Sequence, residues 1–236
     1  MNYLAHFVYN HEVCGRPVEP YFALGVVLPD LWLRYSRRHR IRWPAVRAAT
    51  LADRVDVQLQ AGLLNHVAVD RAFHVLPVFL RWQRELRAAI DGDAVHPALI
   101  DFLVHMCLEL ALDHHLLVAA PDLVERFYGV VAQCDARRAA ARVGVLGAVS
   151  TDGLDEVIRQ FVARRFLRHY RTPAGMTDVV RIVLKLAEIP APPDALLDDI
   201  TARSVVLADP AAVWAGLPRG QGCNIGGGVR NGRPAR

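Results

Sequence analysis

The sequence lacks several features that would each point to a particular class of protein. Its four cysteines, at positions 14, 107, 134 and 223, form no CxxC pair. That spacing argues against a zinc ribbon and against a disulfide scaffold. No uncharged apolar run reaches the roughly 18 residues that a membrane span needs. The N-terminal MNYLAHFVYN also lacks the basic and apolar regions of a secretory signal. We therefore expect a reduced, cytoplasmic protein without a transmembrane segment.

A strong excess of charge is missing as well. The formal net charge is only +4, and aromatic and basic residues are not interleaved as base-stacking surfaces require, so we expect no nucleic-acid partner. The arginines instead gather in two clusters, within residues 34–47 and 164–171. Arg34, Arg37 and Arg38 are the residues that we expect to bind an acidic partner. A solvated face is the alternative for both clusters.

Strand signals are scarce, because no Asn-Gly or Asp-Gly dipeptide separates two alternating apolar runs. Apolar residues recur instead at spacings of three and four, which predicts helices. We expect them at about residues 2–12, 20–38, 45–76, 77–91, 96–118, 120–135, 136–149, 152–170, 174–188 and 193–206. With 53% hydrophobic residues, the chain predicts one all-α bundle over residues 1–216. Residues 217–236, rich in Gly and Arg, are predicted to form a disordered tail.

Two apolar helices each carry a ladder of three polar side chains spaced four residues apart, so that each ladder follows one helix face. The ladders are His66, Asp70 and His74 in residues 61–76, and His105, Glu109 and Asp113 in residues 102–119. Desolvating each carboxylate costs several kcal/mol unless it is paired or binds a metal. Facing ladders of this kind build metal sites in helical bundles. We therefore predict a divalent-metal site, for which Mn²⁺, Fe²⁺ and Mg²⁺ suit the ligands and Zn²⁺ is a further option.

Each of these polar residues has a structural alternative. A buried carboxylate network with Arg or Tyr partners is the alternative for the three acids, and His74 or His105 taken singly is typical of a core histidine. His6, four residues after Asn2, and Asp30, directly after Pro29, are expected to converge on the same site. For Asp30 the alternative is a helix N-terminal acid that the macrodipole favours.

The order of these residues resembles the acyl carrier protein phosphodiesterase (holo-ACP hydrolase) family, a divergent helical relative of the HD phosphohydrolases. Five segments carry the resemblance, which extends over about residues 1–206. They are MNYLAH at the N-terminus, GVVLPDL at 25–31, GLLNHVAVDRAFHVLP at 62–77, LELALDHHL at 108–116 and FLRHYRTPAGMTDVVRIVLKLA at 166–187.

The resemblance implies an HD-phosphohydrolase-like fold and removal of the 4′-phosphopantetheine arm from an acidic acyl carrier protein, with a divalent metal that is commonly Mn²⁺. The metal ligands that it implies are His66, Asp70, Glu109, Asp113 and His114. The catalytic residues that it implies are Asp30, His66 and His6. Val67 stands where the family has an arginine, and Glu109 where it has an aspartate.

Four functions stay open at this point. The first is a metal-dependent phosphodiester hydrolase that acts on acyl carrier protein or on a small-molecule phosphodiester. The second is an iron-dependent oxygenase, because His and carboxylate ligands in a bundle also hold iron. The third is a zinc phospholipase C-like protein, to which the fragment ALGVVLPD is similar. The fourth is a relative that binds carrier proteins without catalysis.

Overall fold

The computed structural model describes residues 1–36, 38–90 and 95–218, and every regular element in these ranges is helical. The α-helices are α1 (Tyr3–Val8), α2 (Pro20–Tyr35), α3 (Trp43–Ala48), α4 (Arg54–His74), α5 (Pro77–Ala88), α6 (Pro97–Ala119), α7 (Leu123–Val131), α8 (Ala136–Gly147), α9 (Leu154–Arg164), α10 (Pro173–Ala187), α11 (Asp194–Leu207) and α12 (Pro210–Gly216). A π-helix, η1 (Tyr9–Val13), continues α1, and a 3-10 helix, η2 (Phe166–Arg171), precedes α10. The predicted all-α class is confirmed.

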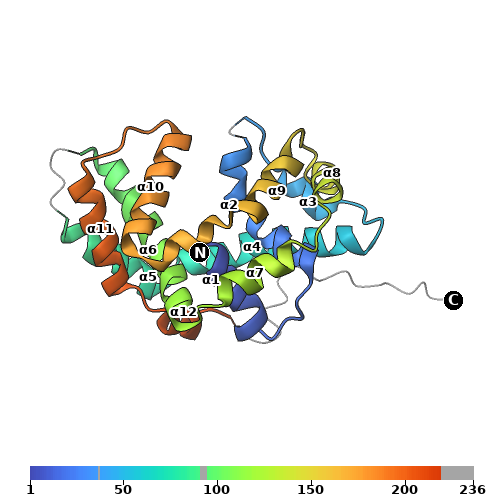
Figure 1. Cartoon of the computed structure of the whole chain (residues 1–236). Helices are drawn as coiled ribbons and strands as arrows, with labels where there is room; N and C mark the ends of the chain where they lie inside the picture. Colours follow the sequence, from blue (N-terminus) through green and yellow to red (C-terminus); the bar gives the residue numbers. More distant parts are fainter. Residues whose placement is uncertain (37, 91–94, 219–236) are drawn as a thin grey trace.

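Two groups of helices flank the N-terminal segment (Figure 1). One group contains α5, α6, α10 and α11, and the other contains α2, α3, α4, α8 and α9, with the N-terminus at the centre of the view. Within the described residues, α2 and α4 share the largest contact, and α6 packs against α11. Because α1 packs against both α2 and α6, it joins the two groups.

The crossing of α2 and α4 depends on a glycine in each helix. A Cβ on Gly25 would lie 2.7 Å from a backbone oxygen of α4, and a Cβ on Gly62 would overlap a backbone oxygen of α2. Only residues without a Cβ allow two helix backbones to approach so closely. The crossing brings Asp30 of α2 to His66 of α4, with Asp30 Oδ1 3.7 Å from His66 Nε2.

The predicted boundaries agree with the structure to within a few residues for most helices, but two predicted helices differ and one observed helix was not predicted. The helix predicted over residues 45–76 is two helices, because α3 ends at Ala48 and Asp53 caps α4 by accepting a hydrogen bond from the amide of Asp56. The helix predicted over 152–170 ends at Arg164, since Arg165 has a left-handed φ of 47°. The short α12 has no counterpart among the predicted helices.

The cysteines and the start of the predicted tail depart from expectation. Cys107 and Cys134 are free thiols, whereas Cys14 is disulfide-bonded, which differs from the wholly reduced chain that we expected. Leu217, the first residue of the predicted tail, is buried, and the Tyr9 hydroxyl donates a hydrogen bond to the carbonyl of Pro218. Residues 219–236 lie outside the described part of the chain.

Helix α6 also meets a simple test for a membrane span. It is long and apolar enough to cross a bilayer, as are α4 and α5 taken together with their bend of 61°. Of the most apolar stretch of α6, 56% is buried inside the protein. A core helix of this composition passes the same test, so the predicted absence of a transmembrane segment stays a prediction.

Candidate metal centre

The first cluster of ligand atoms joins α1 to α4, and we call it the first group. It consists of His6, His66 and Asp70, whose ligand atoms lie within 4.8 Å of one another. His6 Nε2 lies 3.4 Å from Asp70 Oδ1, and His66 Nε2 lies 3.9 Å from Asp70 Oδ2. The two imidazole centroids are 4.6 Å apart. Three of the residues predicted for the site therefore lie close enough to share one ion.

The second group joins α4 to α6 and consists of His74, His105 and Glu109. His74 Nε2 and His105 Nε2 lie 3.0 and 3.1 Å from Glu109 Oε1. It adjoins the first group, because His74 Nδ1 is 3.9 Å from Asp70 Oδ2. The spacing of four places His74 and His105 in the two ladders, but only Glu109 of this group was among the ligands that we expected. The core-histidine alternative for His74 and His105 is not what the structure shows, since each imidazole contacts the Glu109 carboxylate.

The α-amino group of Met1 lies between the two groups. It donates hydrogen bonds to Asp70 Oδ1 at 2.6 Å and to Glu109 Oε1 at 3.1 Å. Burial disfavours the charged amine, but the negative charges of Glu109, Asp70 and Asp30 outweigh this effect and raise its pKa to about 10. The carboxylates thus create a buried position that stabilises a cation.

Several buried polar atoms of the first group and its neighbour have no hydrogen-bond partner among the described residues. They are Nδ1 of His6, Nδ1 of His66 and Oδ2 of Asp30. Each unsatisfied buried group costs about 1–3 kcal/mol, so several at one place are unusual in a native protein. Imidazole nitrogens and carboxylate oxygens are also the usual ligands of divalent metals. The donor set present here therefore fits a divalent ion.

Burial and neighbouring charges shift the pKa values of these side chains. Burial lowers the pKa of His66 to about 3. Burial would raise the pKa values of Asp70 and Glu109, but the Met1 ammonium and the neighbouring histidines together outweigh it and lower both pKa values. The pKa of Asp30 is raised well above its ordinary value, first by burial and then by the charge of Asp70. Neutral imidazoles and ionised carboxylates are the forms that bind metal ions.

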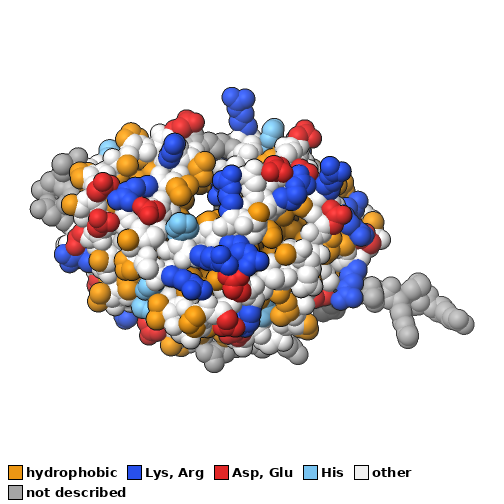
Figure 2. Space-filling view, in the orientation of Figure 1, with side chains coloured by type: hydrophobic (Ala, Val, Ile, Leu, Met, Phe, Trp, Pro, Cys, Tyr) orange, Lys and Arg blue, Asp and Glu red, His pale blue; other side chains and the backbone are white. Residues whose placement is uncertain are grey.

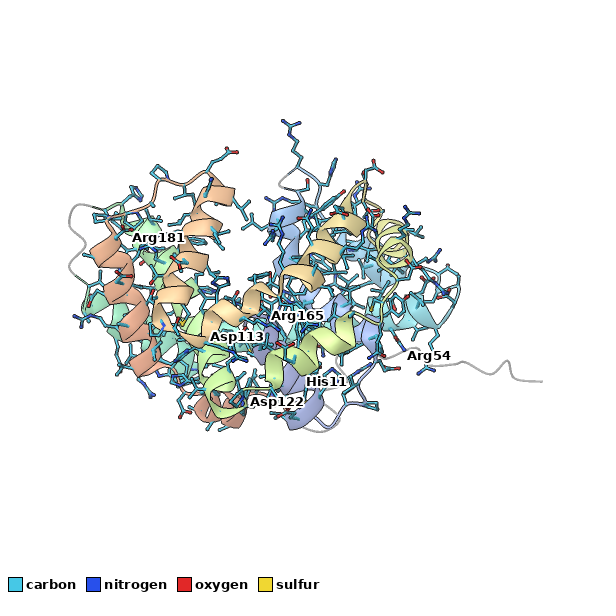
Figure 3. The ribbon with its side chains drawn as sticks, in the orientation of Figure 1. His11, Arg54, Asp113, Asp122, Arg165 and Arg181 are labelled. Carbon is cyan, nitrogen blue, oxygen red and sulfur yellow. The ribbon has the colours of Figure 1, made fainter. Side chains whose placement is uncertain are left out.

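Asp113 and His114, which we expected as metal ligands, lie outside both groups. The Asp113 carboxylate accepts hydrogen bonds from the amides of Leu4 and Ala5 at 3.0 and 2.7 Å. These amides belong to the first turn of α1, where the helix itself provides no acceptor. His114 Nδ1 donates to the carbonyl of Tyr170 at 2.8 Å. Figure 3 shows Asp113 near the centre of the molecule. It holds α1, and thereby His6, in place.

Helix geometry explains why the third rung of each ladder points elsewhere. Eight residues at 3.6 per turn rotate a side chain by about 80°. On α6 this rotation takes Asp113 away from the direction of His105 and toward α1. On α4 the same rotation lets His66 join the first group while His74 joins the second. The ladders therefore produce two adjoining groups rather than the one site that we predicted.

A cavity of about 320 Å³ opens beside these groups, and Asp30, His105 and Glu109 line it. Arg34 lines it as well, near the end of α2. Arg38 is exposed, and Arg37 lies outside the described residues. Helix α2 continues through Pro29 and carries Asp30 in its interior, so Asp30 is not the helix N-terminal acid of the alternative interpretation.

No family model, curated protein or solved structure matches the chain.

Proposed function

We propose that the protein is a metal-dependent phosphodiester hydrolase. One observation carries the proposal: two groups, each with two imidazoles and a carboxylate, adjoin each other, and His105 and Glu109 of the second group line a cavity. The cavity volume of about 320 Å³ lies at the lower end of the range for small-molecule sites. Two adjoining ions form a common arrangement for in-line displacement at phosphorus.

Each side chain has a role in this proposal. The first and second groups would each hold a divalent ion, which when bound would lower the pKa of water and neutralise phosphoryl charge. Asp30 lines the cavity and orients the attacking water by hydrogen bonding. Arg34 pairs with a phosphoryl oxygen. The water oxygen would form a bond to phosphorus as the ester P–O bond breaks, and the proton that the water loses would end on the departing oxygen.

The proposal extends to an HD-phosphohydrolase-like fold and to holo acyl carrier protein as the first macromolecular substrate to test. Its support is the order of the five segments that resemble the acyl carrier protein phosphodiesterase family. Charge adds to it, since Arg34 lines the cavity and Arg38 is exposed four residues further along the chain. Acidic carrier proteins would be drawn to such a surface mainly through a faster association rate.

Elemental analysis and hydrolysis assays test the proposal directly. The purified protein should carry Mn²⁺, Fe²⁺, Mg²⁺ or Zn²⁺, and should cleave bis(4-nitrophenyl) phosphate and release 4′-phosphopantetheine from holo acyl carrier protein. His66→Ala should lose both metal and turnover. His115→Ala is the matched control, because His115 donates to the carbonyl of Val205 and belongs to neither group. Equal turnover in the two variants would contradict the proposal, and so would protein that binds none of these metals.

One observation favours a second candidate, an iron-dependent oxygenase. Two histidines and one carboxylate with open positions form the ligand set typical of non-haem iron enzymes, and both groups have this composition. Oxygen consumption by iron-loaded protein, with no phosphodiester cleaved under argon, would favour this candidate. A hydrolysis rate that is the same in air and under argon would favour the hydrolase.

A further inference from the structure

The cavity beside the metal groups is mostly apolar. It is formed by side chains of α2, α6, α10 and η2 together with the N-terminal residues. Its apolar lining includes Leu33, Met106, Leu110, Phe166, Val179 and Val183. A small polar phosphodiester would leave most of this lining in contact with water. The composition instead suits a ligand that has an apolar part.

The mouth of the cavity exposes large hydrophobic side chains. Ile182 is 51% exposed, and Leu33, Phe102 and Leu186 are 37–38% exposed, although all four line the cavity. They come from α2, α6 and α10, so three separate helices present apolar surface to one opening. Figure 2 shows a hollow between α10 and α2 with hydrophobic side chains along its edge. Exposed hydrophobic residues that adjoin one another mark binding surfaces.

A basic group accompanies this apolar lining. Arg34 forms no ion pair within the described residues, and its guanidinium lies 5.7 Å from the ring centroid of Phe166 in the cavity wall. Two nearby arginines differ, because Arg165, which follows α9, and Arg168 of η2 both pair with Glu125. Arg34 is therefore available to an anionic group on a ligand whose apolar part fills the cavity.

We propose that this cavity binds a phosphate ester carrying a single apolar chain. The chain lies against α6 and α10, and the phosphate faces Arg34 on the lining that also includes His105 and Glu109. The inference that this ester is the substrate rests on the proposed hydrolase function. Binding of the chain follows from the cavity alone and can be measured without turnover.

A series of chain lengths tests the proposal in the full chain. The probes are the ethyl, butyl and octyl 4-nitrophenyl phosphates, each below its micelle-forming concentration. Each buried methylene is worth about a fourfold gain in binding, so kcat/KM should rise at least tenfold from ethyl to octyl. Octyl phosphate should also displace a naphthalenesulfonate dye from protein kept in a chelator. Equal kcat/KM for the three esters, or a dye that octyl phosphate leaves in place, would overturn the proposal.

Variants at the mouth separate chain binding from other effects. Ile182→Asp should cut the octyl-to-ethyl ratio of kcat/KM at least tenfold, and Ile182→Ser should cut it less, because it adds no charge. Ile182 is exposed enough for the fold to tolerate either substitution. Val145→Asp on α8 is the matched control, because Val145 is 60% exposed and lies outside the cavity lining. A ratio that falls equally in all three variants would overturn the proposal.

The outcomes distinguish the cavity from the reaction. Dye displacement by octyl phosphate, weakened in Arg34→Gln, with no ester cleaved, would support the chain site and contradict the hydrolase. Cleavage of all esters with no chain preference would support the hydrolase and overturn the chain site. Rapid cleavage of holo acyl carrier protein together with equal rates for ethyl and octyl esters would also overturn it, in favour of recognition through the carrier protein.

Discussion

The two halves of α4 bury polar side chains in opposite ways. Near its N-terminus, the side chain of Asp56 is fully buried and accepts a hydrogen bond from the amide of Ala52 at 2.8 Å. Both of its oxygens also bind the guanidinium of Arg142. Gln60 in turn donates to the carbonyl of Val46 at 2.7 Å. Around Asp56, protein atoms supply the partners of each buried group.

The second half of the same helix differs. His66 Nδ1 has no hydrogen-bond partner among the described residues, and Asp70 faces the buried amine of Met1 rather than an arginine. His74 reaches across to Glu109 of α6 and is 34% exposed. The comparison teaches that burial alone does not identify a functional acid. Asp56 is more deeply buried than Asp70, yet its neighbours already satisfy it, so it has no capacity left for a ligand.

Replacing Asp70 with Asn should have the largest effect, and it tests the difference between the two halves of α4 most directly. A ligand of the first group is lost, so the variant should bind less metal and show no rise in Tm on addition of Mn²⁺. Turnover of a phosphodiester should fall by more than about 100-fold. A loss of roughly 100-fold is the upper range when a residue that only hydrogen-bonds to a metal ligand is removed. Metal analysis and thermal melts check this. Full metal content and turnover in the variant would place the site elsewhere.

Replacing Asp56 with Ala should affect stability and leave the metal site alone. The amide of Ala52 would lose its acceptor and the partly exposed Arg142 its carboxylate, so the free energy of unfolding should fall by about 1–3 kcal/mol. Urea denaturation measures this, and metal content should match the wild type. Asp53→Ala is a matched control that removes the helix cap, worth about 1 kcal/mol, together with an exposed ion pair to Arg138. A loss of metal in Asp56→Ala would contradict the distinction between the two halves.

A methyl group at Gly62 would test the crossing that lies between the two halves. Its Cβ would overlap a backbone oxygen of α2, so the helices must separate. Overpacking of this kind costs about 2 kcal/mol and should also weaken metal binding, because Asp30 and His66 face each other across the crossing. Gly129→Ala on α7 is the control, since no atom lies within 4 Å of its added Cβ. We expect that variant to be as stable as the wild type or more so.

The smallest effect that we expect is the loss at low pH of the stability that Asp56 contributes. Hydrogen bonds from Arg142 lower the pKa of Asp56 below its ordinary value of 3.8. A carboxyl with a lowered folded-state pKa contributes stability above its ordinary value and loses it as pH falls through the folded-state value. The difference in unfolding free energy between wild type and Asp56→Asn should therefore shrink below about pH 4. Urea curves from neutral to acidic pH measure this, and a constant difference would contradict it.

The sequence predicts the helical class and part of the site for physical reasons that are local. Apolar spacing determines which face of a helix is buried, and a spacing of four puts His66 and Asp70 on one face. Which acid meets a partner depends on distant segments that no local pattern reveals. Asp113 differs from Glu109 because α1 packs beside it and offers two amides. The position of the Met1 amine likewise depends on how α1 packs between the helix groups.

The tie between Asp113 and α1 also affects when the site can form during protein synthesis. Leu4 and Asp113 are 109 residues apart in the chain. At about 5–20 residues per second, a ribosome needs roughly 5 to 20 seconds to make the residues between them. Until α6 is made, His6 lacks its anchor and the second group lacks His105 and Glu109. In the proposed function, metal loading of both groups would therefore follow synthesis of α6, and a bound ion would slow unfolding rather than guide the first steps of folding.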